Sequence, residues 1–172
     1  MKRFAWCFTV LLLLNSCGED RSKDGLKETI EEHVDALQAL PGTEDQLAIR
    51  DTMRLELIAS LLDFYHTFPD DAYAPECLDK VHFVYSAMRD YRTAAKYGDT
   101  ILLEYPDYIN KEMVIESQYN TYDMFVTPRN KEKAAYYLNL WLKEFPDMDA
   151  DKRKQIEHRL DYIDLTIDQM IE

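Results

Sequence analysis

The fold of this chain is decided by residues 75–107, which read PECLDKVHFVYSAMRDYRTAAKYGDTILLEYPD. The spacing of apolar residues here is helical, as it is almost throughout residues 26–171, and no segment shows a sustained two-residue alternation. The stretch ends at Tyr105-Pro106-Asp107. Proline supplies the stop, because it can neither continue the hydrogen-bond ladder of a helix nor let its predecessor be helical. We therefore expect helices, and no strands, to build the protein.

The same ending occurs three times along the chain. At spacings of 37 and 40 residues, a helical stretch closes at Phe68-Pro69-Asp70, Tyr105-Pro106-Asp107 and Phe145-Pro146-Asp147. A self-similar period of this length is typical of stacked helical pairs. The aromatic residue before each proline can pack back on the preceding turn.

Within this period the residues resemble tetratricopeptide repeats. The matching positions of residues 75–107 are Leu78, Val81 and Tyr85 on the first helix, Asp90-Tyr91 on the turn, and Ala94, Ile101 and Pro106 on the second helix. A small side chain at Ala94 would let the two helices approach closely. Residues 115–147 match less well, at Tyr122, Phe125, Ala134, Trp141 and Pro146, and residues 26–70 match only at the second helix.

The resemblance implies a fold class for residues 26–172. It is all-α, a tetratricopeptide-like α-solenoid of about three antiparallel helix pairs with a C-terminal capping helix. His82 and Tyr122 replace the small residue usual at the eighth position of the repeat, so we expect a wider or differently angled helix contact. The cap is predicted as one amphipathic helix from about Asp149 to Ile171. Docking of this helix on a partner is the alternative.

Positive charge, a short apolar run and a cysteine follow one another at the N-terminus. Lys2 and Arg3 precede residues 4–14, which are too few to span a bilayer as a helix, and Leu14-Asn15-Ser16-Cys17 follows. This order predicts a removable export signal over residues 1–16. Its ending resembles the lipobox of bacterial lipoproteins, which implies cleavage before Cys17 and acylation of that residue. The alternative is an ordinary secretory signal with a chance cysteine.

The residues after the cysteine bear on location. Residues 17–25 are polar and are predicted to form a lipidated, flexible tether. By the sorting logic of lipoproteins, Gly18 lacks the aspartate that retains such proteins in the inner membrane, which implies a lipid anchor in the outer membrane. Glu19-Asp20 partly resembles an acidic signal for surface export, so the periplasmic and the cell-surface face both stay open.

The chain is acidic, with 33 Asp and Glu against 20 Lys and Arg and a formal net charge of −13. Such a chain repels DNA, RNA and anionic lipid surfaces, and no basic cluster opposes that field, so we expect no nucleic-acid partner. Of the three cysteines, Cys7 leaves with the signal and Cys17 is the predicted acylation site. Cys77 is expected to be a small, buried core residue on a helix.

No constellation of residues predicts catalysis, a cofactor or a metal site. The sequence has no Gly-rich phosphate loop, no Gly-x-Ser-x-Gly and no Cys-x-x-Cys. The nearest metal-like pattern is Asp63-x-x-His66 with Asp79-x-x-His82. The repeat register places His82 inward and His66 near a helix end, so these groups are not expected to converge. We expect a packed His82, an exposed His66 and a protein that is not an enzyme.

The surface best suited to binding is the concave face lined by the first helix of each repeat. The tetratricopeptide register places there Glu76, Asp79, Lys80, Phe83 and Ser86 from the middle repeat and Glu116, Tyr119, Asn120 and Asp123 from the next. Aromatic anchors ringed by carboxylates suit an extended peptide that bears Lys or Arg. The alternative is a solvated face without a binding role.

These expectations describe a lipid-anchored cell-envelope scaffold that binds another envelope protein through a Lys- or Arg-bearing segment. In architecture it resembles the repeat proteins of outer-membrane assembly and envelope coordination. The alternative is an accessory lipoprotein of a nutrient-uptake or surface-enzyme system that binds a carbohydrate or another small ligand. A deep closed pocket among Phe83, Tyr119 and Tyr122 would favour the small ligand, whereas an open acidic groove would favour a protein.

Overall fold

The part of the chain that the structure describes consists of helices and turns. The computed structural model describes residues 21–41, 43 and 46–171. Its eight helices in these ranges are α1 (Lys23–Ala39), α2 (Leu47–Thr67), α3 (Ala74–Ala87), α4 (Tyr91–Glu104), α5 (Lys111–Asn120), α6 (Lys131–Glu144), α7 (Ala150–Asp161) and α8 (Ile167–Ile171). A π-helical turn, Thr121–Phe125, continues α5. The predicted all-α class is confirmed.

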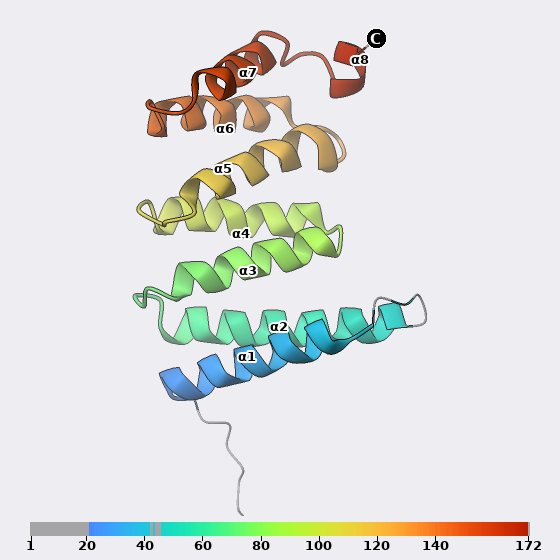
Figure 1. The fold of residues 1–172 in the computed structure, drawn as a ribbon, viewed down its shortest axis with the longest axis vertical. Coiled ribbons are helices and arrows are strands. Elements are labelled where there is room, and N and C mark those ends of the chain that lie inside the picture. The colour runs from blue at the N-terminus through green and yellow to red at the C-terminus, as the bar shows by residue number, and fades with distance from the viewer. Residues whose placement is uncertain (1–20, 42, 44–45, 172) are drawn as a thin grey trace, which may run out of the picture.

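Consecutive helices pack against each other in antiparallel order. Each helix from α1 to α6 contacts the next one in the chain. Figure 1 shows them following one another along the longest axis of the molecule, from α1 at one end to α7 and α8 at the other. The turns that leave α2, α4 and α6 all lie along one edge of this arrangement (Figure 1).

The three predicted helix stops are confirmed. Phe68, Tyr105 and Phe145 are the C-cap residues of α2, α4 and α6, and each donates its backbone N–H to the carbonyl four residues earlier. The ring of Phe68 also packs on the preceding turn, with its centroid 5.4 Å from that of Phe64. Local chemistry therefore ends these helices where the proline follows.

Small side chains allow α3 and α4 to pack closely against each other. Ala94 has no exposed surface, as the close crossing requires, and Leu78 and Val81 are equally buried beside it. Cys77 is fully buried too, so its predicted core position is confirmed. Burial raises the pKa of its thiol to about 12, which leaves it protonated and unreactive at neutral pH.

His82, which replaces the small residue usual in the repeat, fills the junction of three helices. Its Nδ1 donates to the Ala94 carbonyl on α4 at 2.8 Å, and its Nε2 lies 2.7 Å from Ser117 Oγ on α5. The ring thus bridges α3, α4 and α5 with both nitrogens in use. The predicted packed His82 is confirmed, and His66 is exposed as expected.

The close approach of α4 and α5 depends on Gly98. A Cβ atom at this position would lie 2.5 Å from Cδ of Gln118. The Gln118 side chain is fully buried there, where its Nε2 donates to the Ala95 carbonyl at 2.8 Å and to the Asp99 carboxylate. Any larger residue at this position would therefore force the buried Gln118 side chain to move.

The C-terminal residues form two helices, which corrects the single helix predicted over 149–171. α7 ends at Asp161, the chain turns, and α8 follows. Arg159 stabilises the turn by donating to the carbonyl oxygens of Tyr162 at 2.7 Å and Leu165 at 2.9 Å. These bonds tie the guanidinium group of α7 to both ends of the turn between the two helices.

A capping box starts α8. Gln169 Oε1 accepts the backbone N–H of Thr166 at 2.9 Å, and Thr166 Oγ1 accepts the backbone N–H of Gln169 at 3.3 Å. This reciprocal pair is a known start signal for helices. The sequence Thr166-x-x-Gln169 is therefore a local signal from which the start of the second helix could have been predicted.

The N-terminal helix starts inside the segment predicted as a tether. Ser22 caps α1, its Oγ accepting the Gly25 N–H at 3.1 Å, so residues 23–25 are helical. The predicted signal 1–16, Cys17 and residues 18–20 lie outside the described residues. The described helices include none with the length and apolarity needed to cross a membrane.

Candidate functional site

The predicted binding residues do not form one surface. Some line a groove at the start of α3, some line a smaller hollow between α3 and α5, and some are turned into the protein. The groove is lined by Glu76, Asp79 and Lys80 among the predicted residues. The hollow has a volume of about 330 Å³ and is lined by Ser86, Glu116 and Asn120. Phe83 is 71% exposed on α3 and lines neither of them.

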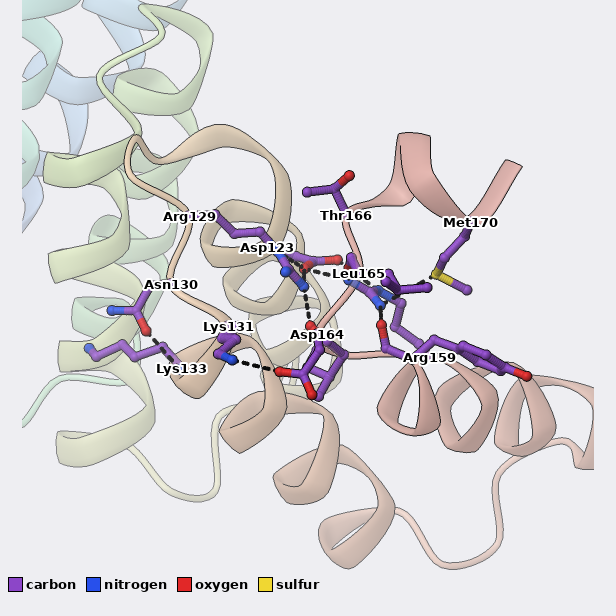
Figure 2. Close-up of polar contacts among 12 residues, drawn as sticks. Asp123, Arg129, Asn130, Lys131, Lys133, Arg159, Asp164, Leu165, Thr166 and Met170 are labelled. Atoms are coloured by element: carbon purple, nitrogen blue, oxygen red, sulfur yellow. Dashed lines mark hydrogen bonds and ion pairs between the residues drawn. The ribbon is translucent and has the colours of Figure 1, made fainter. Parts of the chain in front are cut away.

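Asp123 does not lie on the predicted open face, because its carboxylate is buried and paired. Figure 2 shows Arg129 and Arg159 converging on it. Arg129 Nε donates to Oδ1 at 2.8 Å, while Arg159 donates from Nε to Oδ2 and from Nη2 to Oδ1, both at 2.9 Å. The prediction assumed that α5 continues as an ideal α-helix. The π-helical turn Thr121–Phe125 changes the rotation per residue, and Asp123 faces α7 instead.

Tyr119 is half-buried instead of fully exposed. Its half-buried side chain packs against the core formed by α5, α6 and α7, and Tyr122 packs against the same core. Burial, and then the Asp123 carboxylate, raise the pKa of Tyr119. Because Phe83 points into solvent, the three rings do not enclose a common pocket of the kind that would favour a small ligand.

An open groove of about 740 Å³ lies between the start of α3 and the turn that joins α4 to α5. Its lining residues, which define the α3 groove, are Ala72, Pro75, Glu76, Asp79, Lys80 and residues 104–110. Sequence reasoning predicted the α3 side alone, because it considered the first helix of each pair and left the turns out. The repeated stop at Tyr105-Pro106-Asp107 marks the missed side.

A chain of hydrogen bonds fixes the wall of the groove nearest α5. Tyr108 donates its hydroxyl to Asp79 Oδ2 at 2.9 Å, and Asn110 Nδ2 donates to the Tyr108 oxygen at 3.1 Å. Burial, together with the Asp79 carboxylate, raises the pKa of Tyr108 well above its ordinary value, so this hydroxyl stays protonated. Tyr105 donates to the Pro69 carbonyl at 2.8 Å, which ties the groove turn to the preceding turn.

The ammonium group of Lys80 is already occupied. Its Nζ donates to the Tyr73 hydroxyl at 2.9 Å and to Glu76 Oε1 at 3.0 Å, and lies 4.6 Å from the centroid of the Tyr73 ring. Burial acts to lower the pKa of Lys80, but the two hydrogen bonds outweigh it and raise the pKa. Lys80 therefore neutralises Glu76 and leaves the other carboxylates of the groove unpaired.

The other three carboxylates, Asp79, Glu104 and Asp107, form no ion pair within the described ranges. Glu104 Oε2 accepts the hydroxyl of Tyr65 at 2.7 Å, a bond that raises the pKa of Tyr65 to about 12. Asp107 is exposed on the turn. The lining thus holds four carboxylates against one ammonium group. Its potential is negative in a chain whose formal net charge is already −13.

Apolar surface borders these charges. Ile109 is 91% exposed at the edge of the groove, and Pro75 and Pro106 also line it. An exposed isoleucine beside free carboxylates can accept a ligand that presents a cation and an apolar group together. The described residues contain no group of three or more His, Cys, Asp or Glu side chains placed to hold a metal ion.

In comparisons with known proteins, no protein family, no curated protein and no solved structure matches the chain.

Proposed function

We propose that this protein is a lipid-anchored scaffold of the bacterial cell envelope that holds another protein in the α3 groove. Its helix pairs are proposed to be tetratricopeptide-like and to form an α-solenoid. The sequential packing of antiparallel helices supports this architecture, as do the aromatic-Pro-Asp stops at one edge and the fully buried Ala94. Solenoids of this kind commonly present extended surfaces for binding proteins.

The observation that carries the proposal is the combination of open shape, negative charge and exposed apolar surface in the α3 groove. An open groove suits an extended protein segment better than a small molecule, which needs a pocket that buries most of its surface. Ile109 supplies apolar contact, and the unpaired Glu104 and Asp107 supply selection for positive charge. Both walls are held by hydrogen bonds before a ligand arrives, which lowers the entropy cost of binding.

The anchor is proposed at Cys17, with acyl chains in the outer membrane. Residues 17–22 connect it to α1, and an extended chain of this length spans at most about 20 Å. The scaffold would therefore stay close to the membrane and meet partners that are themselves in or near the envelope. Two acyl chains suffice for stable attachment.

The test is comparative capture from detergent-solubilised envelopes of the native cells. The tagged lipoprotein is compared with a groove variant, Asp107→Lys with Ile109→Ala, and with the control Leu103→Ala. Leu103 is 80% exposed and lines a different hollow, between α4 and α6. We expect a protein captured by the wild type and the control to be lost from the groove variant. Retention of every captured protein by the groove variant would contradict the proposal.

A further inference from the structure

The helix pair α5–α6 contains an ion pair that the preceding pair lacks. Lys111 is the first residue of α5, Glu144 is the last residue of α6, and Lys111 Nζ lies 2.7 Å from Glu144 Oε2. This bond, and the charge of the lysine, hold the pKa of the Glu144 carboxyl below its ordinary value. The pair joins the two ends of the helical hairpin, and Lys143 Nζ adds a longer contact of 3.5 Å to the other oxygen, Oε1.

In the pair α3–α4 the carboxylate is present but its ammonium partner is not. Glu104 is the last residue of α4 and corresponds to Glu144, forty residues later, whereas the residue forty positions before Lys111 is Asp71, just before α3. Asp71 is itself an acid, and its carboxylate is already paired with Lys23, whose Nζ lies 2.5 Å from Oδ2. The α3 groove opens beside Glu104, and Lys80, the one cation in its lining, is engaged by Glu76 and Tyr73.

We propose that the α3 groove binds a lysine side chain of the partner protein, and that its ammonium group takes at Glu104 the place that Lys111 takes at Glu144. This inference rests on the proposed function, since it names what the same groove selects. The apolar residues beside the partner lysine pack on Ile109 and Pro106, which line the same groove as Glu104. Because the groove is negatively charged, charge complementarity favours a basic, extended segment as its occupant.

The geometry at Glu104 favours lysine over arginine. The Tyr65 hydroxyl already occupies Oε2, so the two parallel hydrogen bonds of a guanidinium group would compete with it. An ammonium group is a compact point charge and needs a single carboxylate oxygen, as Lys111 shows on Glu144. The neighbouring Asp107 adds attraction without imposing a planar geometry.

The test uses the detergent-solubilised lipoprotein and a set of fluorescent, terminally blocked pentapeptides, Ala-Leu-X-Leu-Ala. X is lysine, arginine, acetyl-lysine or norleucine, and binding is followed by fluorescence anisotropy at low salt. We expect the lysine peptide to bind more tightly than the acetyl-lysine peptide, by about 1.5-fold to fivefold, the range for an exposed ion pair. It should also bind more tightly than the arginine peptide. Equal affinity for the lysine and acetyl-lysine peptides, or no measurable lysine-dependent binding, would overturn the inference.

Two isosteric variants test whether the preference for the lysine peptide depends on Glu104. Glu104→Gln keeps an acceptor for the Tyr65 hydroxyl but removes the charge, so it should abolish the preference for lysine. Glu144→Gln makes the same change in the pair that supplies its own lysine, and it should leave the preference intact. A preference that survives Glu104→Gln would overturn the inference. If capture of the native partner still depends on Ile109 in that case, the proposed function stands without the lysine.

Discussion

Arg159 and Asp123 form the most deeply buried ion pair in the described part of the chain. Their side chains are 7% and 0% exposed, and two hydrogen bonds of 2.9 Å join the guanidinium group to the carboxylate. The pair connects the π-helical turn after α5 to α7 (Figure 2). Because Arg159 and Arg129 also donate to carbonyl oxygens of residues 162–165, one carboxylate organises the C-terminal end of the protein.

Replacing that carboxylate should destabilise the protein. Asp123→Asn keeps the shape of the side chain but leaves the guanidinium groups of Arg129 and Arg159 without a counter-charge. Breaking a buried pair in this way costs about 3–5 kcal/mol. We expect the free energy of unfolding, measured by urea denaturation, to fall by that amount and amide exchange in residues 162–171 to accelerate.

A matched control separates this effect from the general loss of a negative charge. Asp151→Asn changes a side chain on α7 that is 84% exposed, so the free energy of unfolding should stay within about 0.5 kcal/mol of the wild type. Equal stability of Asp123→Asn and the wild type would show that the buried pair does not hold the C-terminal helices.

Gly98→Ala should also destabilise the protein. Helix propensity alone predicts a gain of about 1 kcal/mol for this change. Overpacking against Gln118 costs about 1–3 kcal/mol, and we expect it to dominate because both residues are buried. Adding Gln118→Ala should relieve the clash, so thermal or urea unfolding of the double variant should show coupling between the sites. Strict additivity would contradict the proposed contact.

The Glu112 carboxylate should make stability depend on pH. Trp141 Nε1 donates to it at 3.0 Å and Lys152 Nζ at 3.1 Å, and these bonds hold its pKa below the ordinary 4.5. Since the unfolded chain then binds more protons, this stabilisation is present above about pH 4.5 and is lost as the pH falls through the folded pKa.

Glu112→Gln should therefore lower the free energy of unfolding at pH 7, by less than about 1 kcal/mol for so exposed a group, and less at pH 3. Urea denaturation at the two pH values measures the difference. Glu157→Gln, an exposed change on α7, should have no such pH-dependent effect. An identical loss at both pH values for Glu112→Gln would show that the carboxylate charge is not the cause.

The predicted anchor has its own test. In Cys17→Ser the sulfur that would carry the lipid is absent, so cells fed a palmitate analogue should label the wild type and not the variant. The variant should also accumulate as an uncleaved precursor. Equal labelling of both proteins would end the lipoprotein interpretation.

Most of the fold could be predicted because its signals are local. The aromatic-Pro-Asp stops and the apolar spacing of α3 and α4 depend on neighbouring residues, and the structure has helices there. The break between α7 and α8 depends on Arg159, which acts across the turn, together with the Thr166-x-x-Gln169 capping box that the predicted single helix passed over. These contacts therefore break the segment into two helices, although its apolar residues are spaced as in one continuous helix.

The groove was predictable in part. Glu76, Asp79 and Lys80 lie on its α3 side as expected, because helix periodicity places them. Asp123 was misplaced, because we know no sequence signal for the π-helical turn that turns it inward. The unpaired Glu104 was missed because the ends of the paired helices were not compared, although Lys111 against Asp71 at the forty-residue spacing is visible in the sequence.

In-cell photo-cross-linking from Ile109 tests the central claim most directly. A photo-activatable residue replaces Ile109 at the edge of the α3 groove or, as the control, Leu103 on α4, two aliphatic side chains that are 91% and 80% exposed. We predict that the Ile109 position cross-links one envelope protein, at a segment that contains lysine, and that the Leu103 position does not. Cross-linking of that protein from Leu103 but not from Ile109, or of no protein from Ile109, would contradict a partner in the groove.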